Sequence, residues 1–434
     1  MFQPSASKPL DKYATYPSRL ARAARTLLFR MMDMRAPFLS ATPPTGPLVI
    51  LGAGYAGVTL AQRVWQRAKG GLPIILVDQS PLHVLRTELY EIGEMASVVG
   101  NTRWSLPLQE IFDRTNVRFQ QGKVLAIDLA HRRVELDTVG VKFGTLAICL
   151  GNQPAFYGVE GAREHAHQVY GLEGARRLAG AVRESELASV HLKGERRPRF
   201  VVIGGGATGT ELAGDLATTD WPSATSPGAR SPEVVLITGA LPFLPGLPAS
   251  VQRRARDQLQ GAGVRLLEGV NTTRVEPRSV FLEDGSKLTA DLVVWAAGVE
   301  APSTARALPV AHGRGGRIAV MPTLEVPGFP GVFAVGDVAE VVDPTTRMPV
   351  PQTAQAAIAE ALAAADNLLA LRVSARLHPF VYREGASILA VGPKRGAATV
   401  RGVTLWGRPA SWLKRLVARE YVRSLRRGEP SQLL

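Results

Sequence analysis

The sequence has little cysteine and no long hydrophobic run. Its 434 residues include one cysteine, Cys149, which excludes an intramolecular disulfide, a Cys-x-x-Cys redox pair and a thiolate-rich metal cluster. No uninterrupted apolar stretch approaches the roughly 18–20 residues of a membrane-spanning helix, and no secretory signal pattern is present. Hydrophobic residues make up 46% and charged residues 20%, which is typical of globular domains. We therefore expect a large intracellular protein of two to three domains.

The positive charge is concentrated at the two ends of the chain. Lys and Arg number 51 and Asp and Glu 37, a net charge of +14. Residues 1–47 carry a net charge of +5 and residues 401–434 a net charge of +6. Basic ends on a near-neutral body predict docking to an anionic surface, either lipid or nucleic acid. The alternative is an ordinary Arg-rich, soluble protein, and residues 1–47 also have the composition of a transit peptide.

Two segments repeat the order strand, glycine motif, helix, strand. Gly52, Gly54 and Gly57 follow the first predicted strand, at residues 48–51. In such a motif the first glycine permits the turn, the second lets backbone N–H groups approach a pyrophosphate, and the third allows close helix–strand packing. Asp78 ends the next strand, where a carboxylate accepts hydrogen bonds from ribose hydroxyls. This register predicts a dinucleotide site.

The second motif begins about 150 residues later, with Gly204, Gly206 and Gly209. Glu211 is expected in the first turn of the following helix, either orienting a ligand or interacting with the helix dipole. The next strand ends in Thr238, with no acid to repel a 2′-phosphate, so NADPH stays admissible beside NADH. Two such units predict an α/β fold with a duplicated nucleotide-binding architecture.

Further strands are predicted beyond these two units. Those at 292–295 and 332–335 end in glycine turns, at Gly298 and at Gly336 with Asp337. Either could be an ordinary strand end, but the Asp337 carboxylate is well placed to bind a polyol hydroxyl. Short strands at 380–382, 388–391 and 399–400 are expected to precede a basic helical tail.

With these motifs in order, the chain resembles the two-dinucleotide-binding-domain flavoproteins, and within them the type II (non-proton-pumping) NADH:quinone oxidoreductases. The resemblance covers residues 47–410 and is carried by the two glycine motifs, by "LVD" at 76–78 followed by His83, by "DLVVWAAGV" at 291–299, by "VFAVGD" at 332–337 and by "TAQAA" at 353–357. It implies two Rossmann-like domains, for FAD and NAD(P)H, and a small C-terminal membrane-associating region. The implied parts are a basic N-terminal extension (1–46), an FAD domain in two pieces (47–170 and 300–370), an NAD(P)H domain (171–299) and a C-terminal region with a basic tail (371–434).

The resemblance also implies residue roles. Hydride would pass from NADH to a non-covalently bound FAD, and two electrons would then pass to a membrane quinone. The implied FAD contacts are Gly52, Gly54, Gly57, Asp78 and Asp337, and Gly204, Gly206, Gly209 and Glu211 would line the nicotinamide side. Gly336, Thr238 and Gly298 are further candidates for cofactor binding. The candidate catalytic residues are Glu211 and Lys394, which would orient cofactors and tune the charge around the flavin, and Gln355 at the quinone site.

The chain departs from this family in three ways. Thr238 stands where relatives usually have glutamate, and Ala359 replaces the second glutamine of their A-Q-x-A-x-Q quinone motif. The C-terminal region is also shorter and more charged than a typical family membrane anchor.

Three residues have simpler interpretations. Gln355 could be a surface amide, His83 is interpreted as a solvated loop histidine, and Cys149 is interpreted as a small buried hydrophobe.

Other functions remain open from the sequence. One is an NAD(P)H reductase for a soluble or protein acceptor, and another is a flavin-bearing redox sensor whose basic ends bind nucleic acid. The second resembles the apoptosis-inducing-factor relatives and is disfavoured. The single cysteine disfavours sulfide:quinone oxidoreductases, and no metal is expected because no ligand cluster is visible. A homodimer stays open.

Both ends have amphipathic helical patterns. The apolar residues of segment 18–35 fall on one arc, with its arginines off that arc, and the tail at 412–427 places Trp412, Leu416 and Tyr421 among six basic residues. We therefore expect peripheral binding to an anionic membrane surface, at the cytoplasmic face of the cell membrane. The mitochondrial inner membrane replaces it if residues 1–47 are a transit segment. The alternative is that a terminal helix packs on its own domain.

Overall fold

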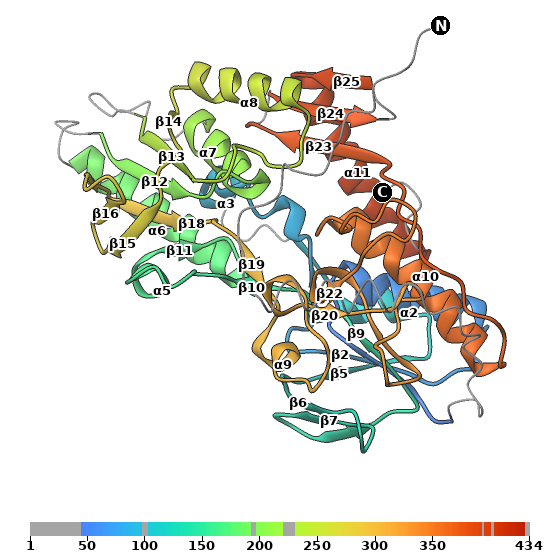
Figure 1. The fold of residues 1–434 in the computed structure, drawn as a ribbon. Coiled ribbons are helices and arrows are strands. Elements are labelled where there is room, and N and C mark those ends of the chain that lie inside the picture. Colours follow the sequence, from blue (N-terminus) through green and yellow to red (C-terminus); the bar gives the residue numbers. More distant parts are fainter. Residues whose placement is uncertain are drawn as a thin grey trace, which may run out of the picture.

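The computed structural model describes residues 45–97, 103–191, 197–219, 231–392, 395–400 and 403–429. Two five-stranded parallel sheets form its two halves (Figure 1). The first sheet has the order β21 (Val332–Ala334), β9 (Thr145–Ile148), β1 (Leu48–Leu51), β2 (Ile74–Asp78) and β5 (Val117–Gln121). The second has the order β11 (His167–Gln168), β18 (Leu292–Trp295), β12 (Arg199–Ile203), β13 (Glu233–Gly239) and β14 (Arg265–Glu268). The predicted α/β class with a duplicated architecture is confirmed.

The strand sequences explain why these sheets are parallel and covered on both faces. β1, β9 and β18 are short runs without polar alternation, and all their residues are buried. A strand buried on both faces has no polar side to expose, which favours the centre of a parallel sheet. The chain leaves the first sheet after β9, builds the second half, and returns to the first sheet only with β21.

Each half also carries an antiparallel three-stranded sheet. The strands are β6 (Val124–Asp128), β7 (Arg133–Leu136) and β8 (Gly140–Lys142) in the first half, and β15 (Thr272–Glu276), β16 (Ser279–Leu282) and β17 (Lys287–Thr289) in the second. Two-stranded pairs are β3 (Leu82–Val84) with β4 (Ser105–Pro107), β10 (Gln153–Pro154) with β19 (Val299–Glu300), and β20 (Ile318–Ala319) with β22 (Ala339–Glu340).

Helices surround the two parallel sheets. They are α2 (Tyr55–Arg67), α3 (Ile92–Ser97), α4 (Leu108–Phe112), α5 (Ala162–His165), α6 (Gly171–His191), α7 (Ala207–Thr218), α8 (Ala249–Gly261), α9 (Ser303–Arg306), α10 (Ala354–Arg372) and α11 (Arg408–Arg427). α2 follows the first glycine motif and α7 follows the second, as the sequence predicts.

Among the described residues, α10 has the length and apolar composition of a membrane span. However, 56% of its most apolar window is buried inside the protein, and the helix packs along α2. It also buries two polar side chains, Glu360 and Asn367. We therefore interpret α10 as a core helix.

The C-terminal region is a three-stranded antiparallel sheet followed by α11. Its strands are β23 (Ala386–Ala390), β24 (Gly396–Val400) and β25 (Val403–Trp406). The strand predicted at 380–382 is wrong, because that segment is irregular; its Tyr382 N–H donates to the Asp343 carboxylate at 2.7 Å instead of to a neighbouring strand. α11 ends at Arg427 and is capped by Gly428, whose φ of +70° is the left-handed conformation that glycine adopts readily.

The tail does not lie on the surface along its whole length. Trp412 is 61% exposed and Leu416 38%, but Tyr421 is 2% and Leu425 1% exposed, both within the core of the first half. The prediction that Tyr421 belongs to a membrane-facing arc is therefore wrong: its side chain docks on the body of the protein. The helix predicted at 18–35 lies outside the described residues.

Candidate functional site

The first glycine motif joins β1 to α2, and each glycine is needed for a different reason. Gly52 has φ of +99°, and a Cβ there would lie 2.3 Å from the Cys149 carbonyl oxygen on the neighbouring strand end. A Cβ on Gly57 would lie 1.8 Å from the Gly52 carbonyl oxygen. A Cβ on Gly54 would meet nothing within 4 Å. Gly52 and Gly57 are thus required for folding, whereas Gly54 borders open space.

The second motif repeats this pattern between β12 and α7. Gly204 has φ of +129°, and its Cβ would lie 2.2 Å from the Ala296 carbonyl oxygen. A Cβ on Gly209 would lie 1.9 Å from the Gly204 carbonyl oxygen, and a Cβ on Gly206 would again meet nothing within 4 Å. The open space beside each second glycine is a cradle that a side chain would fill. Both motifs therefore fit a dinucleotide pyrophosphate at a helix N-terminus.

The acid expected to bind ribose is held by the first turn itself. Asp78, at the end of β2, accepts a hydrogen bond from the Ala53 N–H at 2.7 Å and another from the Ser80 N–H at 2.9 Å. Burial raises the pKa of the Asp78 carboxyl group, and the two backbone donors oppose that rise. The ribose role of Asp78 stays a prediction.

His83 is not the solvated loop histidine expected from the sequence. It lies on β3 with no exposed surface, and its Nδ1 is 2.9 Å from the Ala53 carbonyl oxygen. Its Nε2 is 3.1 Å from the hydroxyl oxygen of Tyr421 on α11. Burial lowers the pKa of His83 to about 4, so the imidazole is neutral at physiological pH. The expectation fails because the C-terminal helix covers this residue.

Asp337 follows β21 and accepts the last of two linked side-chain hydrogen bonds, from Arg86 to Asn152 and from Asn152 to Asp337. Its Oδ2 accepts from Asn152 Nδ2 at 2.7 Å, and the Asn152 Oδ1 accepts from Arg86 Nη1 at 3.3 Å. Burial raises the pKa of Asp337, while the charges of Arg86 and Arg317 lower it. The sequence did not single out Asn152 or Arg86, because neither lies in a recognisable motif.

Gly336 is fixed by a buried acid on α10. Its N–H donates to Glu360 Oε2 at 2.7 Å, and its φ is +76°. Burial raises the pKa of Glu360 to about 8. Glu360 directly follows Ala359, the position that departs from the family pattern, but it had no assigned role.

Glu211 is paired with the C-terminal helix. It is the fifth residue of α7, so its expected place in the first turn is wrong. Its Oε1 accepts from Lys414 Nζ at 2.7 Å and from the Ala390 N–H at 2.9 Å, and both side chains of the ion pair are about 90% buried. The Lys414 ammonium also lies 4.0 Å from the centre of the Tyr90 ring. Lys414 is one of the six basic residues of the tail that were expected to face a membrane, and the structure contradicts this for Lys414.

The remaining predicted residues are placed as follows. Lys394 lies outside the described residues. Gln355 is the second residue of α10; with its amide oriented to satisfy both groups, it donates to the Ala386 carbonyl oxygen at 2.9 Å and accepts from the Gly385 N–H at 2.7 Å. These bonds attach α10 to the segment that leads into β23, so Gln355 is not a free surface amide.

Thr238 and Gly298 each lie in close contact with another residue, Thr238 with Gly205 and Gly298 with Tyr157. Thr238, near the end of β13, is buried. A Cβ added to Gly205 would lie 2.6 Å from the Cβ of Thr238. Gly298 has φ of +152°, and a Cβ there would lie 2.3 Å from the hydroxyl oxygen of Tyr157, a 70% exposed side chain that the sequence did not indicate. The carboxyl ends of β12, β13 and β18 thus meet at one edge, as ligand-binding ends of parallel strands do.

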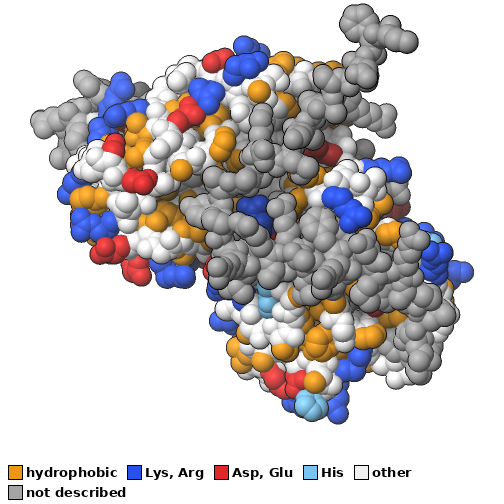
Figure 2. Space-filling model, in the orientation of Figure 1, with side chains coloured by type: hydrophobic (Ala, Val, Ile, Leu, Met, Phe, Trp, Pro, Cys, Tyr) orange, Lys and Arg blue, Asp and Glu red, His pale blue; other side chains and the backbone are white. Residues whose placement is uncertain are grey.

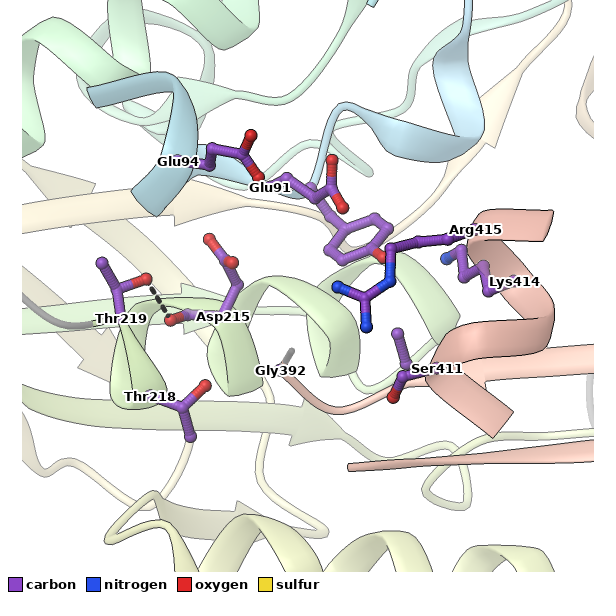
Figure 3. A pocket seen from close by; sticks show the side chains of 11 residues that line it. Glu91, Glu94, Asp215, Thr218, Thr219, Gly392, Ser411, Lys414 and Arg415 are labelled. Atoms are coloured by element: carbon purple, nitrogen blue, oxygen red, sulfur yellow. Dashed lines mark hydrogen bonds between the residues drawn. The ribbon is translucent and has the colours of Figure 1, made fainter. Parts of the chain in front are cut away.

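A pocket of about 250 Å³ lies where both halves meet the C-terminal region (Figure 3). Glu91 and Glu94 come from the α3 segment, Asp215 from α7, and Lys414 and Arg415 from α11. Burial raises the pKa of Asp215 to about 7, although the Gly93 N–H donates to its carboxylate at 2.8 Å. The pocket shares Lys414 with the Glu211 pair and does not include the glycine motifs. In the described residues, no group of three or more His, Cys, Asp or Glu is arranged to hold a metal.

Most of the chain is similar to a known protein family and to proteins of known name. Residues 46–361 match the family described as pyridine nucleotide-disulphide oxidoreductase. The type II NADH:quinone oxidoreductase of Staphylococcus saprophyticus is 24% identical over 85% of this chain and 93% of its own length. The Mycobacterium tuberculosis protein named type II NADH:quinone oxidoreductase Ndh is 29% identical over 85% of this chain and 82% of its own.

Solved structures show the same fold. NDH2 from Plasmodium falciparum, solved in complex with NADH, matches with a TM-score of 0.76 at 14% identity, over 88% of this chain and 96% of that chain. The sulfide:quinone oxidoreductase of Aquifex aeolicus matches with a TM-score of 0.73 at 18% identity, over 89% and 92% of the two chains.

Proposed function

The chain belongs to the pyridine nucleotide-disulphide oxidoreductase family, and we propose that within it this protein is an FAD-dependent NADH:quinone oxidoreductase. The net reaction is NADH + H⁺ + quinone → NAD⁺ + quinol. The curated relatives that support this activity, among them those from S. saprophyticus and M. tuberculosis, match most of the chain.

The observation that carries the proposal is the pair of open glycine turns. Gly54 and Gly206 each stand at the N-terminus of a helix, and a Cβ at either position would meet no described atom within 4 Å. Two dinucleotides are needed for this reaction, and the chain offers two equivalent cradles. The first would hold FAD, with Asp78 and Asp337 toward its hydroxyl groups, and the second would hold NADH.

The first motif, with Asp78 and Asp337, would hold FAD, which would supply the hydride-accepting and two-electron-donating chemistry that the reaction needs. The residues of the chain bind and orient the reactants. Glu211 and its partner Lys414 bring opposite charges to the boundary between the second half and the C-terminal region, and Asn152 holds the Asp337 carboxylate. The catalytic roles of Glu211, Lys394 and Gln355 are part of this proposal.

The choice of acceptor follows from the single cysteine and from Gln355. Cys149 directly follows β9 and is buried, and burial raises the pKa of its thiol, so it is an inert core residue. As the single cysteine of the sequence, it cannot form a redox disulfide or the cysteine pair that carries sulfur in sulfide:quinone oxidoreductases. Gln355 retains the first glutamine of the family quinone motif at the start of α10. Ala359, in place of the second, would alter the shape of the quinone pocket.

The decisive experiment is anaerobic reduction of the purified protein. NADH should bleach a yellow, FAD-containing protein, and addition of a ubiquinone or menaquinone analogue should restore the colour. A folded protein that carries no flavin would overturn the proposal. A reduced flavin that passes its electrons to a soluble acceptor but not to quinones would leave only the NAD(P)H reductase.

We also propose that the protein binds a membrane surface through α11. Trp412, Arg415, Leu416, Arg419 and Arg423 are exposed and recur every three or four residues, so they share one face of the helix. On the face drawn in Figure 2, Lys and Arg side chains are scattered over both halves and form no single patch. An apolar and basic helix face of this kind suits an anionic lipid interface.

The membrane proposal is tested by co-sedimentation with anionic and neutral vesicles. Trp412→Ser with Leu416→Ser should reduce binding to anionic vesicles. The matched control is Leu125→Ser on β6, where a similarly exposed apolar residue lies far from the tail in the sequence. A version lacking residues 1–46 measures the contribution of the N-terminal extension. Equal binding to both vesicle types would overturn the proposal.

A further inference from the structure

In the first glycine motif, both backbone polar groups of Ala53, which belong to two consecutive peptide units, are held by side chains. The Ala53 N–H donates to Asp78 Oδ2 at 2.7 Å, and the Ala53 carbonyl oxygen lies 2.9 Å from His83 Nδ1. Ala53 stands between Gly52 and Gly54, in the turn that leads into α2. His83 therefore contacts the backbone of the turn that would bind the pyrophosphate.

The partners of His83 determine which of its nitrogens carries the proton. A carbonyl oxygen only accepts, so Nδ1 must be protonated to bond Ala53. The neutral ring then leaves Nε2 as an acceptor, and the Tyr421 hydroxyl group donates to it across 3.1 Å. Burial lowers the pKa of His83 and raises that of Tyr421, so both groups keep these neutral forms near pH 7. By donating to Nε2, Tyr421 thus stabilises the Nδ1–H tautomer that the Ala53 carbonyl requires.

This contact orients the donor that the motif offers to a ligand. In a trans peptide the carbonyl and the following N–H point in opposite directions. Because the Ala53 carbonyl points at His83, the Gly54 N–H points away from it, and no described residue accepts a hydrogen bond from that N–H. If the His83 contact were lost, the peptide plane could rotate and the Gly54 N–H would lose its direction.

We propose that His83 is a positioning residue for FAD and that Tyr421 acts through it, so that this one contact of α11 controls how tightly FAD is held. This inference rests on the proposed FAD site at the first motif. The Tyr421 ring also packs 5.0 Å from the ring of Tyr55, the first residue of α2. α11 is attached to α2 independently, by Gln62 Nε2 to the Leu425 carbonyl at 3.2 Å and by Gln66 Nε2 to the Gly428 carbonyl at 2.6 Å.

A double-mutant cycle tests this pathway. Tyr421→Phe leaves Nε2 without its donor and should weaken FAD binding roughly tenfold, the effect of one unsatisfied buried group. His83→Asn keeps an N–H donor close to the place of Nδ1 and should retain FAD affinity within about threefold. Since Asn cannot reach Tyr421, adding Tyr421→Phe to His83→Asn should have no further effect. FAD affinity is measured by quenching of flavin fluorescence during titration of the apoprotein.

Two further measurements separate positioning from simple packing. Gln66→Met removes a tie between α2 and α11 that does not involve Ala53, so it should lower apoprotein stability but leave the FAD dissociation constant unchanged. Nitrogen-15 spectra should show His83, identified by its loss in His83→Asn, as the Nδ1–H tautomer, and as a mixture in Tyr421→Phe.

The outcomes distinguish this inference from the proposed function. Additive effects of the two substitutions, an Nε2–H tautomer in the wild-type protein, or equal weakening by Gln66→Met would each overturn the inference while FAD binding by the wild-type protein stands. A wild-type protein that binds no FAD would overturn the proposed function and this inference together.

Discussion

Replacing Gly54 by leucine should remove cofactor binding without harming the fold. Gly54 has φ of −76° and ψ of −164°, an extended conformation that any residue adopts, and a Cβ there meets nothing within 4 Å. The leucine side chain would therefore enter the space proposed for the pyrophosphate. We expect apoprotein stability to change by no more than about 1 kcal/mol, the cost of a less favoured helix N-cap residue.

The loss of affinity follows from the contacts that leucine would block. A hydrogen bond from a backbone N–H to a charged group contributes about 1.5–3 kcal/mol. If two such bonds to the pyrophosphate are lost, FAD binding should weaken by about 3–6 kcal/mol, which is more than about a hundredfold in the dissociation constant.

The matched control is Gly57→Ala, three residues along the same motif. Its Cβ would lie 1.8 Å from the Gly52 carbonyl oxygen, so α2 and β1 would have to separate. We expect this smaller substitution to destabilise the apoprotein by at least about 1–3 kcal/mol, the usual cost of overpacking. Urea unfolding of the two apoproteins measures stability, and flavin fluorescence measures FAD binding. A Gly54→Leu protein that keeps stoichiometric FAD would mean that the first motif is misassigned, and one that fails to fold would mean that the space beside Gly54 is not open.

Three other substitutions test separate parts of the site. Thr238→Glu should raise the preference for NADH over NADPH by roughly 1–3 kcal/mol, measured from kcat/KM for both, because a carboxylate at the end of β13 can bond ribose hydroxyls and repel a 2′-phosphate; a wild-type protein that already rejects NADPH by several orders of magnitude would contradict this. Lys414→Met should lower the free energy of unfolding by about 3–5 kcal/mol, because it leaves Glu211 charged and buried, and adding Glu211→Gln should recover most of that loss; no recovery would argue against the pair. Glu360, whose pKa burial raises from 4.5 to about 8, binds a proton more tightly when folded, so its contribution to apoprotein stability is present below about pH 4.5 and is lost as the pH rises to about 8. Glu360→Gln keeps an acceptor for Gly336 but does not titrate, so wild-type stability should fall relative to this variant over that range, and parallel pH profiles would refute the reasoning.

The sequence by itself determined the two dinucleotide-binding units, because their signals are local. Four consecutive buried apolar residues form β1, and the turn after it needs a glycine with positive φ at Gly52. The third glycine of each motif is required by a backbone atom only five residues away, at Gly52 and at Gly204. Such short-range requirements leave a readable pattern in the chain, and the second unit repeats it.

Only the tertiary structure decided the partners of the buried polar groups. His83 is neutral and buried because Tyr421, 338 residues away, packs on it, and Glu211 is paired with Lys414, 203 residues away. The tail pattern predicts an amphipathic helix correctly, but helical periodicity does not tell whether an apolar face meets lipid or its own domain. That choice depends on which surface the folded body leaves open for α11. Burial and charge pairing between distant segments are properties of the assembled core, so no local spacing of residues encodes them.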